Sequence, residues 1–232
     1  MNRSSVKKSM AKVTPIKLAD LFVLWSNHRQ KWQWDIPFVT PPWLAAWWNS
    51  FADEGESFLL QITMEDRPIG AAPLMLQGTS ARFMGSADLC DYGDLPVAPD
   101  SRDIFCQTLL HYLKEKGIQH LVLKPVRPDS LVRQVLVPIA RQCGWDITIK
   151  PISTSLQMSL PTTWDNYLQN LDPKQRHEVR RKLRKADAEA ETRFFVVTPE
   201  HDLRAEMQSF IDLHQKSTPE KQSLPASHWM ER

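Results

Sequence analysis

Positively charged side chains are concentrated in one short part of the chain. Residues 174–185 hold seven basic residues and one acid, Glu178, and so carry a formal charge of +6, whereas the whole chain carries +2. The basic residues are Lys174, Arg176, Arg180, Arg181, Lys182, Arg184 and Lys185. The planar fork of arginine binds phosphate through two hydrogen bonds. This concentration of charge therefore predicts a surface for a phosphate-bearing ligand, whereas the alternative is a solvated helix face.

The same stretch has the signals of a helix that starts at a defined residue. Asp172 is a suitable N-cap and Pro173 suits the first helical position, directly after a short amphipathic helix over 164–171. The periodicity of 100° per residue puts Arg176 and Arg180 on one face. Lys174 lies beside the positive end of the helix dipole. We therefore expect an anion to bind at Lys174, Arg176 and Arg180, with Arg181 in solvent.

A second candidate site is the run Asp91-Tyr92-Gly93-Asp94, which places two acids and a phenol on an extended segment. Tyr92 and Asp94 could position a substrate, or a carboxylate could accept a proton from an amine. The alternative is an ordinary strand edge with capping aspartates. The sequence assigns no catalytic residue, because no Ser/His/Asp or Cys/His set has a spacing typical of nucleophilic catalysis.

Composition excludes several classes of protein. The three cysteines, Cys90, Cys106 and Cys143, are far apart and lack CxxC spacing or a histidine cluster, so we expect reduced thiols in a cytoplasmic protein and no metal site. No run of 18 apolar residues occurs, so we expect no membrane span. Met1–Lys12 is basic but has no apolar segment after it, which argues against a signal peptide.

The order of predicted elements indicates a mixed α/β fold in which helices cover both faces of a sheet. We expect a flexible tail over 1–15 and a first domain over 16–160. Its last strands are expected at Trp145–Lys150 and Ser155–Leu160. The second unit, 161–232, has two helices, a strand at Arg193–Thr198 and a further helix; because these cannot cover a sheet edge, we expect a fragment of a longer protein.

Six of the nine tryptophans lie between Trp25 and Trp48. Trp43 and Trp47 have helical spacing with Phe51, so we expect them in the core. Trp32 and Trp34 fall in a predicted loop, so we expect this pair to be exposed.

Several stretches together resemble the GNAT-like acyltransferases of the Fem/CelD group, in which two GNAT-type domains are fused. Each stretch alone is a weak signal, but all occur in the family's order over most of residues 20–190. They are 40–48, 69–75, 82–85, 91–94 and 160–168, followed by Lys174, Arg176 and 180–183. Arg82, Gly85 and Ala87 also fit the family's pyrophosphate loop; we do not assign it, because such a loop leads into a helix and the sequence here predicts an extended segment.

The resemblance implies a complete first GNAT-like domain over 16–160 and the beginning of a second GNAT-like domain over 161–232. It implies an N-acyltransferase with acyl-CoA as cosubstrate, an amine as acceptor and no bound cofactor, in cell-envelope or polysaccharide biosynthesis; the fragment itself could be inactive. Aminoacyl-tRNA is the less favoured donor. The alternative is a nucleic-acid-binding module built on the helix 174–185, which the net negative charge of the remaining chain disfavours.

Overall fold

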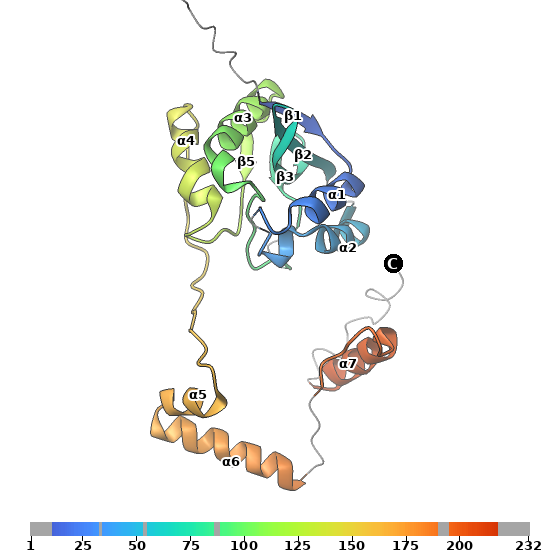
Figure 1. The fold of residues 1–232 in the computed structure, drawn as a ribbon, viewed down its shortest axis with the longest axis vertical. Helices are drawn as coiled ribbons and strands as arrows, with labels where there is room; N and C mark the ends of the chain where they lie inside the picture. The colour runs from blue at the N-terminus through green and yellow to red at the C-terminus, as the bar shows by residue number, and fades with distance from the viewer. Residues whose placement is uncertain (1–10, 33, 53–54, 86–88, 190–194, 218–232) are drawn as a thin grey trace, which may run out of the picture. The chain divides into compact units, whose positions relative to one another are not determined.

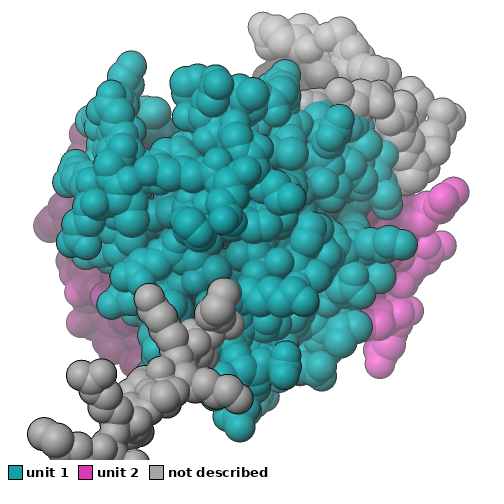
Figure 2. Space-filling view, turned by 90° about the horizontal axis from the view of Figure 1, so that it is seen from above, with its two compact units in different colours: residues 1–152 teal, residues 153–232 magenta. Residues whose placement is uncertain are grey.

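The computed structural model describes residues 11–32, 34–52, 55–85, 89–189 and 195–217. The chain forms two compact units, residues 1–152 and 153–232, which Figure 2 shows in different colours. The division lies within the stretch 145–161, whose residues are described and form neither helix nor strand. The sequence placed the domain boundary at 160/161.

Unit 1 is built on a five-stranded sheet in the order β1-β2-β3-β4-β5. The strands are β1 (Lys12–Pro15), β2 (Glu56–Met64), β3 (Arg67–Gln77), β4 (Ser80–Phe83) and β5 (His120–Val122). The first four strands pair antiparallel, whereas β5 pairs parallel to β4, with Ala81 opposite Leu121. A parallel neighbour requires a crossover connection. Helix α3 (Arg102–Glu115) lies in that connection.

Helices cover both faces of the sheet, because successive strand residues point to opposite faces. Leu60 and Leu74 pack with α3 and with α4 (Val137–Gln142), whereas Leu59 and Met75 pack with α1 (Leu18–His28) and α2 (Pro41–Phe51). Figure 1 shows this three-layer arrangement. The predicted mixed α/β class with helices on both faces is therefore confirmed.

The expected tail contains a strand that the sequence did not reveal. Lys12–Pro15 pairs with β2, with Val13 opposite Ile62, and Val13 packs against the core. This pairing satisfies the backbone N–H and C=O groups of the strand. Its four residues are too few to show an alternation of apolar and polar side chains in the sequence. The flexible-tail prediction is therefore wrong for these residues, whereas residues 1–10 lie outside the described part of the chain.

The predicted strands at Trp145–Lys150 and Ser155–Leu160 are also wrong. All of their residues are described and form no strand. Alternating polarity makes a strand only where a partner pairs with it, and in this stretch Leu156 and Leu160 are largely exposed. In the predicted strand at Arg193–Thr198, residues 195–198 form no strand and the first two residues lie outside the described part.

The loop tryptophans are a further correction. Trp32 and Trp34 are buried, at 5% and 7% exposure, and their rings stack 6.0 Å apart. The loop folds back onto the layer formed by α1 and α2, because packing there removes two large apolar indole rings from water. Trp47 is buried as expected, at 3% exposure.

Asp129 and Ser130 are N-capping residues that predict a helix over Leu131–Cys143, and this helix is present but interrupted. Val132–Leu136 forms a π-helical turn, η4, before α4. Pro138 has no N–H for the usual hydrogen bond to the preceding turn. The wider turn accommodates this loss, and Val137 N donates to Val132 O.

Unit 2 contains the helices α5 (Trp164–Asn170), α6 (Pro173–Glu189) and α7 (Leu203–Ser217). The predicted start of α6 is confirmed, since Gln175 N donates to Asp172 Oδ1 at 2.9 Å. Thr163 caps α5 in the same way, through Asn166 N. None of the helices that the structure describes is long and apolar enough to span a membrane.

Candidate functional site

A small cavity lies where the parallel strands β4 and β5 end. It is lined by Phe38, Val39, Pro73, Phe83, Met84, Gly85, Cys90, Tyr92, Gly93, Lys124 and Pro125. In sheets with parallel strands, ligands bind in the crevice outside the carboxyl ends of the strands. The cavity volume is about 10 Å³, which is room for about one water molecule. A larger ligand must therefore lie over the cavity rather than inside it.

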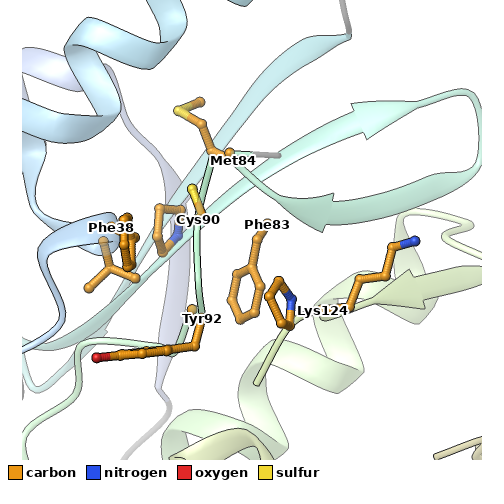
Figure 3. A pocket seen from close by; sticks show the side chains of 11 residues that line it. Phe38, Phe83, Met84, Cys90, Tyr92 and Lys124 are labelled. Carbon is orange, nitrogen blue, oxygen red and sulfur yellow. The ribbon is translucent and has the colours of Figure 1, made fainter. Parts of the chain in front are cut away.

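Aromatic rings form one side of this cavity. Phe38 comes from the short 3₁₀ helix η1 (Pro37–Val39), and its ring meets the ring of Tyr92 edge-on at 5.8 Å. Figure 3 shows Phe38 and Tyr92 together, with the Tyr92 hydroxyl pointing away from Phe83. Lys124 lies on the opposite side of the cavity, and its ammonium group points away from Tyr92. The Tyr92 side is therefore the one that combines aromatic and polar groups.

The backbone around Tyr92 is held by two connections to the segment that follows β5. Gly93 N donates to Pro125 O at 2.9 Å. A Cβ at Gly93 would lie 3.0 Å from the Phe83 ring, so this position has little room for a larger residue. Asp94 makes the second connection. The predicted residue Tyr92 thus lies on a fixed segment at the mouth of the cavity.

Asp94 caps the start of a helix, which is the structural alternative that the sequence left open for the aspartates of this segment. Its carboxylate accepts hydrogen bonds from Leu131 N at 2.7 Å and from Val132 N at 3.1 Å. These are the first free N–H groups of the helix that continues into η4 and α4, where a negative charge is favourable. Burial raises the pKa of Asp94 above its ordinary value, and the backbone hydrogen bonds act in the opposite direction. Asp94 is buried and holds the backbone beside Tyr92 through these hydrogen bonds, whereas its predicted contact with a ligand stays a prediction.

Arg127 is a candidate site residue that the sequence analysis missed. Its guanidinium lies 5.4 Å from the centre of the Tyr92 ring. Asp129 holds it by two hydrogen bonds, from Nε to Oδ1 at 2.9 Å and from Nη2 to Oδ2 at 2.6 Å. The hydrogen bond with Asp129 raises the pKa of Arg127, so the group remains a cation. The motif Arg-Pro-Asp after β5 was the available signal.

The predicted anion-binding residues lie in unit 2, along a groove between α5 and α6. The groove has a volume of about 710 Å³. It is lined by Trp164, Leu168, Pro173, Arg176, His177, Arg180, Leu183, Arg184 and Asp187. The structure thus brings Arg176 and Arg180 together on one surface, as the helical periodicity predicts, whereas Lys174 is exposed but does not line the groove.

Arg176 and Arg181 already have partners within the protein. Arg176 Nη2 donates to Gln169 O at 3.2 Å and to Leu171 O at 3.0 Å, which closes the carboxyl end of α5. Arg181 donates to Glu178 from Nε and Nη2, at 2.8 and 2.7 Å. Arg181 is therefore paired rather than simply solvated. The hydrogen bond with Arg181 lowers the pKa of Glu178 to about 2.

No metal site is apparent in the described residues, which contain no group of three or more His, Cys, Asp or Glu side chains arranged to hold an ion. Two of the cysteines, Cys90 and Cys106, are buried, and Cys143 is exposed.

No protein-family model matches the chain, and no curated protein is similar to it. Among solved structures, the ribosomal-protein-S18-alanine N-acetyltransferase from Escherichia coli is similar over 60% of this chain and 80% of its own, with 14% identity and a TM-score of 0.39.

The glucosamine-6-phosphate N-acetyltransferase from Arabidopsis thaliana is similar over 66% and 99% of the two chains, with 13% identity and a TM-score of 0.33. The PaiA N-acetyltransferase from Thermoplasma acidophilum, solved in complex with coenzyme A, is similar over 47% and 75%, with 16% identity and a TM-score of 0.30.

Proposed function

We propose that this protein is a GNAT-type N-acyltransferase of the Fem/CelD group, which transfers an acyl group from acyl-CoA to an amine. The observation that carries the proposal is the parallel pair β4–β5, whose carboxyl ends frame the cavity beside Tyr92. That is where the topology of such a sheet favours a ligand. The motif resemblance in 40–48 and 91–94 supports it, because both stretches supply residues at or beside this cavity.

The proposed reaction requires the two substrates to be held together. The amine nitrogen attacks the carbonyl carbon of the thioester, a C–N bond forms, the C–S bond breaks, and the thiolate leaves. The amine loses a proton, which a base or water accepts. Correct placement alone can lower such a barrier substantially. We assign no catalytic base, since the Asp94 carboxylate is buried and already binds the start of a helix.

The donor's phosphates are proposed to bind on α6. Arg180 and Arg184 line the groove, and Lys174 lies at the amino end of the helix, where the dipole adds a partial positive charge. Arg176 closes α5 through Nη2 alone, and its Nη1 group is proposed to contact the ligand in the groove. Several phosphates need several cations, and this segment has the highest density of basic residues in the chain.

Unit 2 is proposed to belong to a second GNAT-like domain. Its helices have apolar side chains that are unusually exposed, among them Trp164 at 55%, Phe210 at 60% and Leu213 at 68%. No residue of α6 or α7 is buried. Apolar faces of this extent are typical of surfaces that another part of a domain covers.

A nucleic-acid-binding function is the second candidate, and one observation favours it. Trp164 and Tyr167 stack at 5.2 Å beside a groove that Arg180 and Arg184 line. Stacked aromatic rings next to a basic groove are typical of single-strand binding. It is disfavoured because the charge outside 174–185 is net negative.

The proposed activity is tested by incubating the full chain with acetyl-CoA and a panel of primary amines. We expect free thiol to appear together with the N-acetylated amine, both dependent on the protein and on the amine, as detected by a thiol reagent and by mass spectrometry. Thiol release without an N-acetylated product would indicate hydrolysis. Hydrolysis alone would contradict the proposal.

A further inference from the structure

The guanidinium of Arg127 is prepared for binding before any ligand arrives. Asp129 occupies Nε and one N–H of Nη2. Arginine has five N–H donors in a planar fork. The Nη1 group and the second N–H of Nη2 therefore remain for the Tyr92 hydroxyl or for a ligand. Because two hydrogen bonds and the Tyr92 ring fix its orientation, Arg127 loses little conformational entropy on binding.

The position of Arg127 is equally specific. It stands over Tyr92, which lines the mouth of the cavity, and its side chain is 36% exposed. A solute can reach it, yet the aromatic rings of Phe38 and Tyr92 limit the directions of approach. A ligand that lies over the cavity therefore meets an aromatic surface and one oriented cation.

The charges around Arg127 limit what that ligand can be. Asp129 balances part of the charge of Arg127, and the ammonium group of Lys124 points away from Tyr92 in Figure 3. Asp94 is buried and occupied by two backbone N–H groups. One guanidinium suits a single anionic group, whereas the several phosphates of a coenzyme A need several cations.

We infer that Arg127, oriented by Asp129 over Tyr92, binds an anionic group of the acceptor, so that the acceptor is an amine that also carries a carboxylate or a phosphate. This inference rests on the proposed function, because it assigns the acceptor to the mouth of the cavity. It makes Arg127 a substrate-binding residue and Asp129 the residue that positions it. A carboxylate and a phosphate make the same kind of bidentate contact with arginine.

The experiment measures binding of four probes to the full chain by NMR titration, with no acyl donor present. Phosphoethanolamine is compared with ethanolamine for the phosphate, and β-alanine with β-alaninamide for the carboxylate. Two of the probes, phosphoethanolamine and β-alanine, carry an anionic group and are called the charged probes. We expect one of them to bind at least tenfold more tightly than its counterpart without the anionic group, which is the preference that one charge-assisted hydrogen bond supplies. The charged probe that binds identifies the anion.

Variants show whether Arg127 is responsible. Arg127→Gln should abolish the preference, and Arg127→Lys, which keeps the charge without the fork, should retain only part of it. Arg141→Gln is the matched control, since it removes one exposed positive charge from α4, away from the cavity lining, and should leave the preference unchanged. Circular dichroism verifies that each variant is folded, and Arg127→Lys carries the test if Arg127→Gln is not.

The inference is overturned if neither charged probe is preferred, or if Arg127→Gln and Arg141→Gln reduce binding equally. It is also overturned if coenzyme A displaces the charged probe and loses affinity in Arg127→Gln, because Arg127 would then bind the donor. Failure of the proposed function has a different signature: the Arg127-dependent preference would be present, but acetyl-CoA would neither bind nor be consumed.

Discussion

Replacing Asp94 by alanine is the most informative test of how the candidate site is held together. The substitution removes the acceptor of Leu131 N and Val132 N. Each buried N–H left without a partner costs about 1–3 kcal/mol, and the substitution leaves two of them, although Ser130 Oγ still caps the helix through Arg133 N. Relief of the buried charge, whose cost is seen in the raised pKa, offsets part of this loss. We therefore expect the free energy of unfolding to fall by about 2–4 kcal/mol.

The assay is urea unfolding at neutral pH, followed by tryptophan fluorescence because seven of the nine tryptophans lie in unit 1. Asp91→Ala is the matched control, since Asp91 is an exposed aspartate on the same segment, and should change stability by less than about 0.5 kcal/mol. A fall of similar size in both variants, or no measurable fall in Asp94→Ala, would refute the capping role of Asp94.

The pH dependence of Asp94 gives a second readout with a defined sign. Because the native pKa is raised, the folded state binds the proton more tightly than the unfolded state does. The stability of the wild type should therefore fall, relative to Asp94→Asn, as pH rises from the ordinary aspartate pKa through the raised native value. The measurement is a series of urea midpoints in acidic buffers. A relative rise over that window would contradict the assignment of burial as the cause.

Three further predictions concern the core and the basic helix. Trp47→Ala should lower the free energy of unfolding by about 3–5 kcal/mol, measured by urea unfolding, because it empties a large aromatic site; an unchanged urea midpoint would move Trp47 out of the core. Arg180→Ala should weaken acetyl-CoA binding in calorimetry far more than Arg181→Ala, since Glu178 already pairs Arg181; equal effects would mean that the basic face serves only solubility. Because the pKa of Glu178 is lowered to about 2, its pairing with Arg181 stabilises the folded state above the ordinary pKa of 4.5 and is lost as pH falls from there toward 2. The helix signal of the wild type in circular dichroism should therefore decrease over that window, whereas that of Glu178→Gln should not. Identical acid titrations of the two proteins would contradict this prediction.

Local signals in the sequence predicted the elements that depend on local chemistry. Asp172 and Pro173 define the start of α6. The β2–β3 hairpin was also predictable, because the apolar runs 58–64 and 69–76 flank the turn-forming residues 65–68. Glu65 and Asp66 form the turn, with positive φ values of 50° and 60°, as the twist of a two-residue hairpin requires. In both cases the residues that make the signal are the residues that form the structure.

Features set by contacts between distant segments could not be predicted. Arg127 meets Tyr92 because the α3 crossover brings the end of β5 beside the loop after β4. Trp32 and Trp34 are buried by the return of a loop that has no periodicity of its own. Arg176 has the right spacing for an anion site, but the carboxyl end of α5 competes for its donors. The spacing of basic residues predicts which of them share a face of the helix, but it does not predict which carbonyl groups of a neighbouring helix will bond to them.

The measurement that most directly tests the proposed activity is a comparison of acetyl-CoA with a single-stranded oligonucleotide, by titration calorimetry at two salt concentrations. An acyltransferase should bind acetyl-CoA at one site, and Arg180→Ala should weaken that binding, whereas any oligonucleotide binding should be weak. Tight oligonucleotide binding with a steep salt dependence, together with no affinity for acetyl-CoA, would contradict the acyltransferase assignment in favour of the nucleic-acid module.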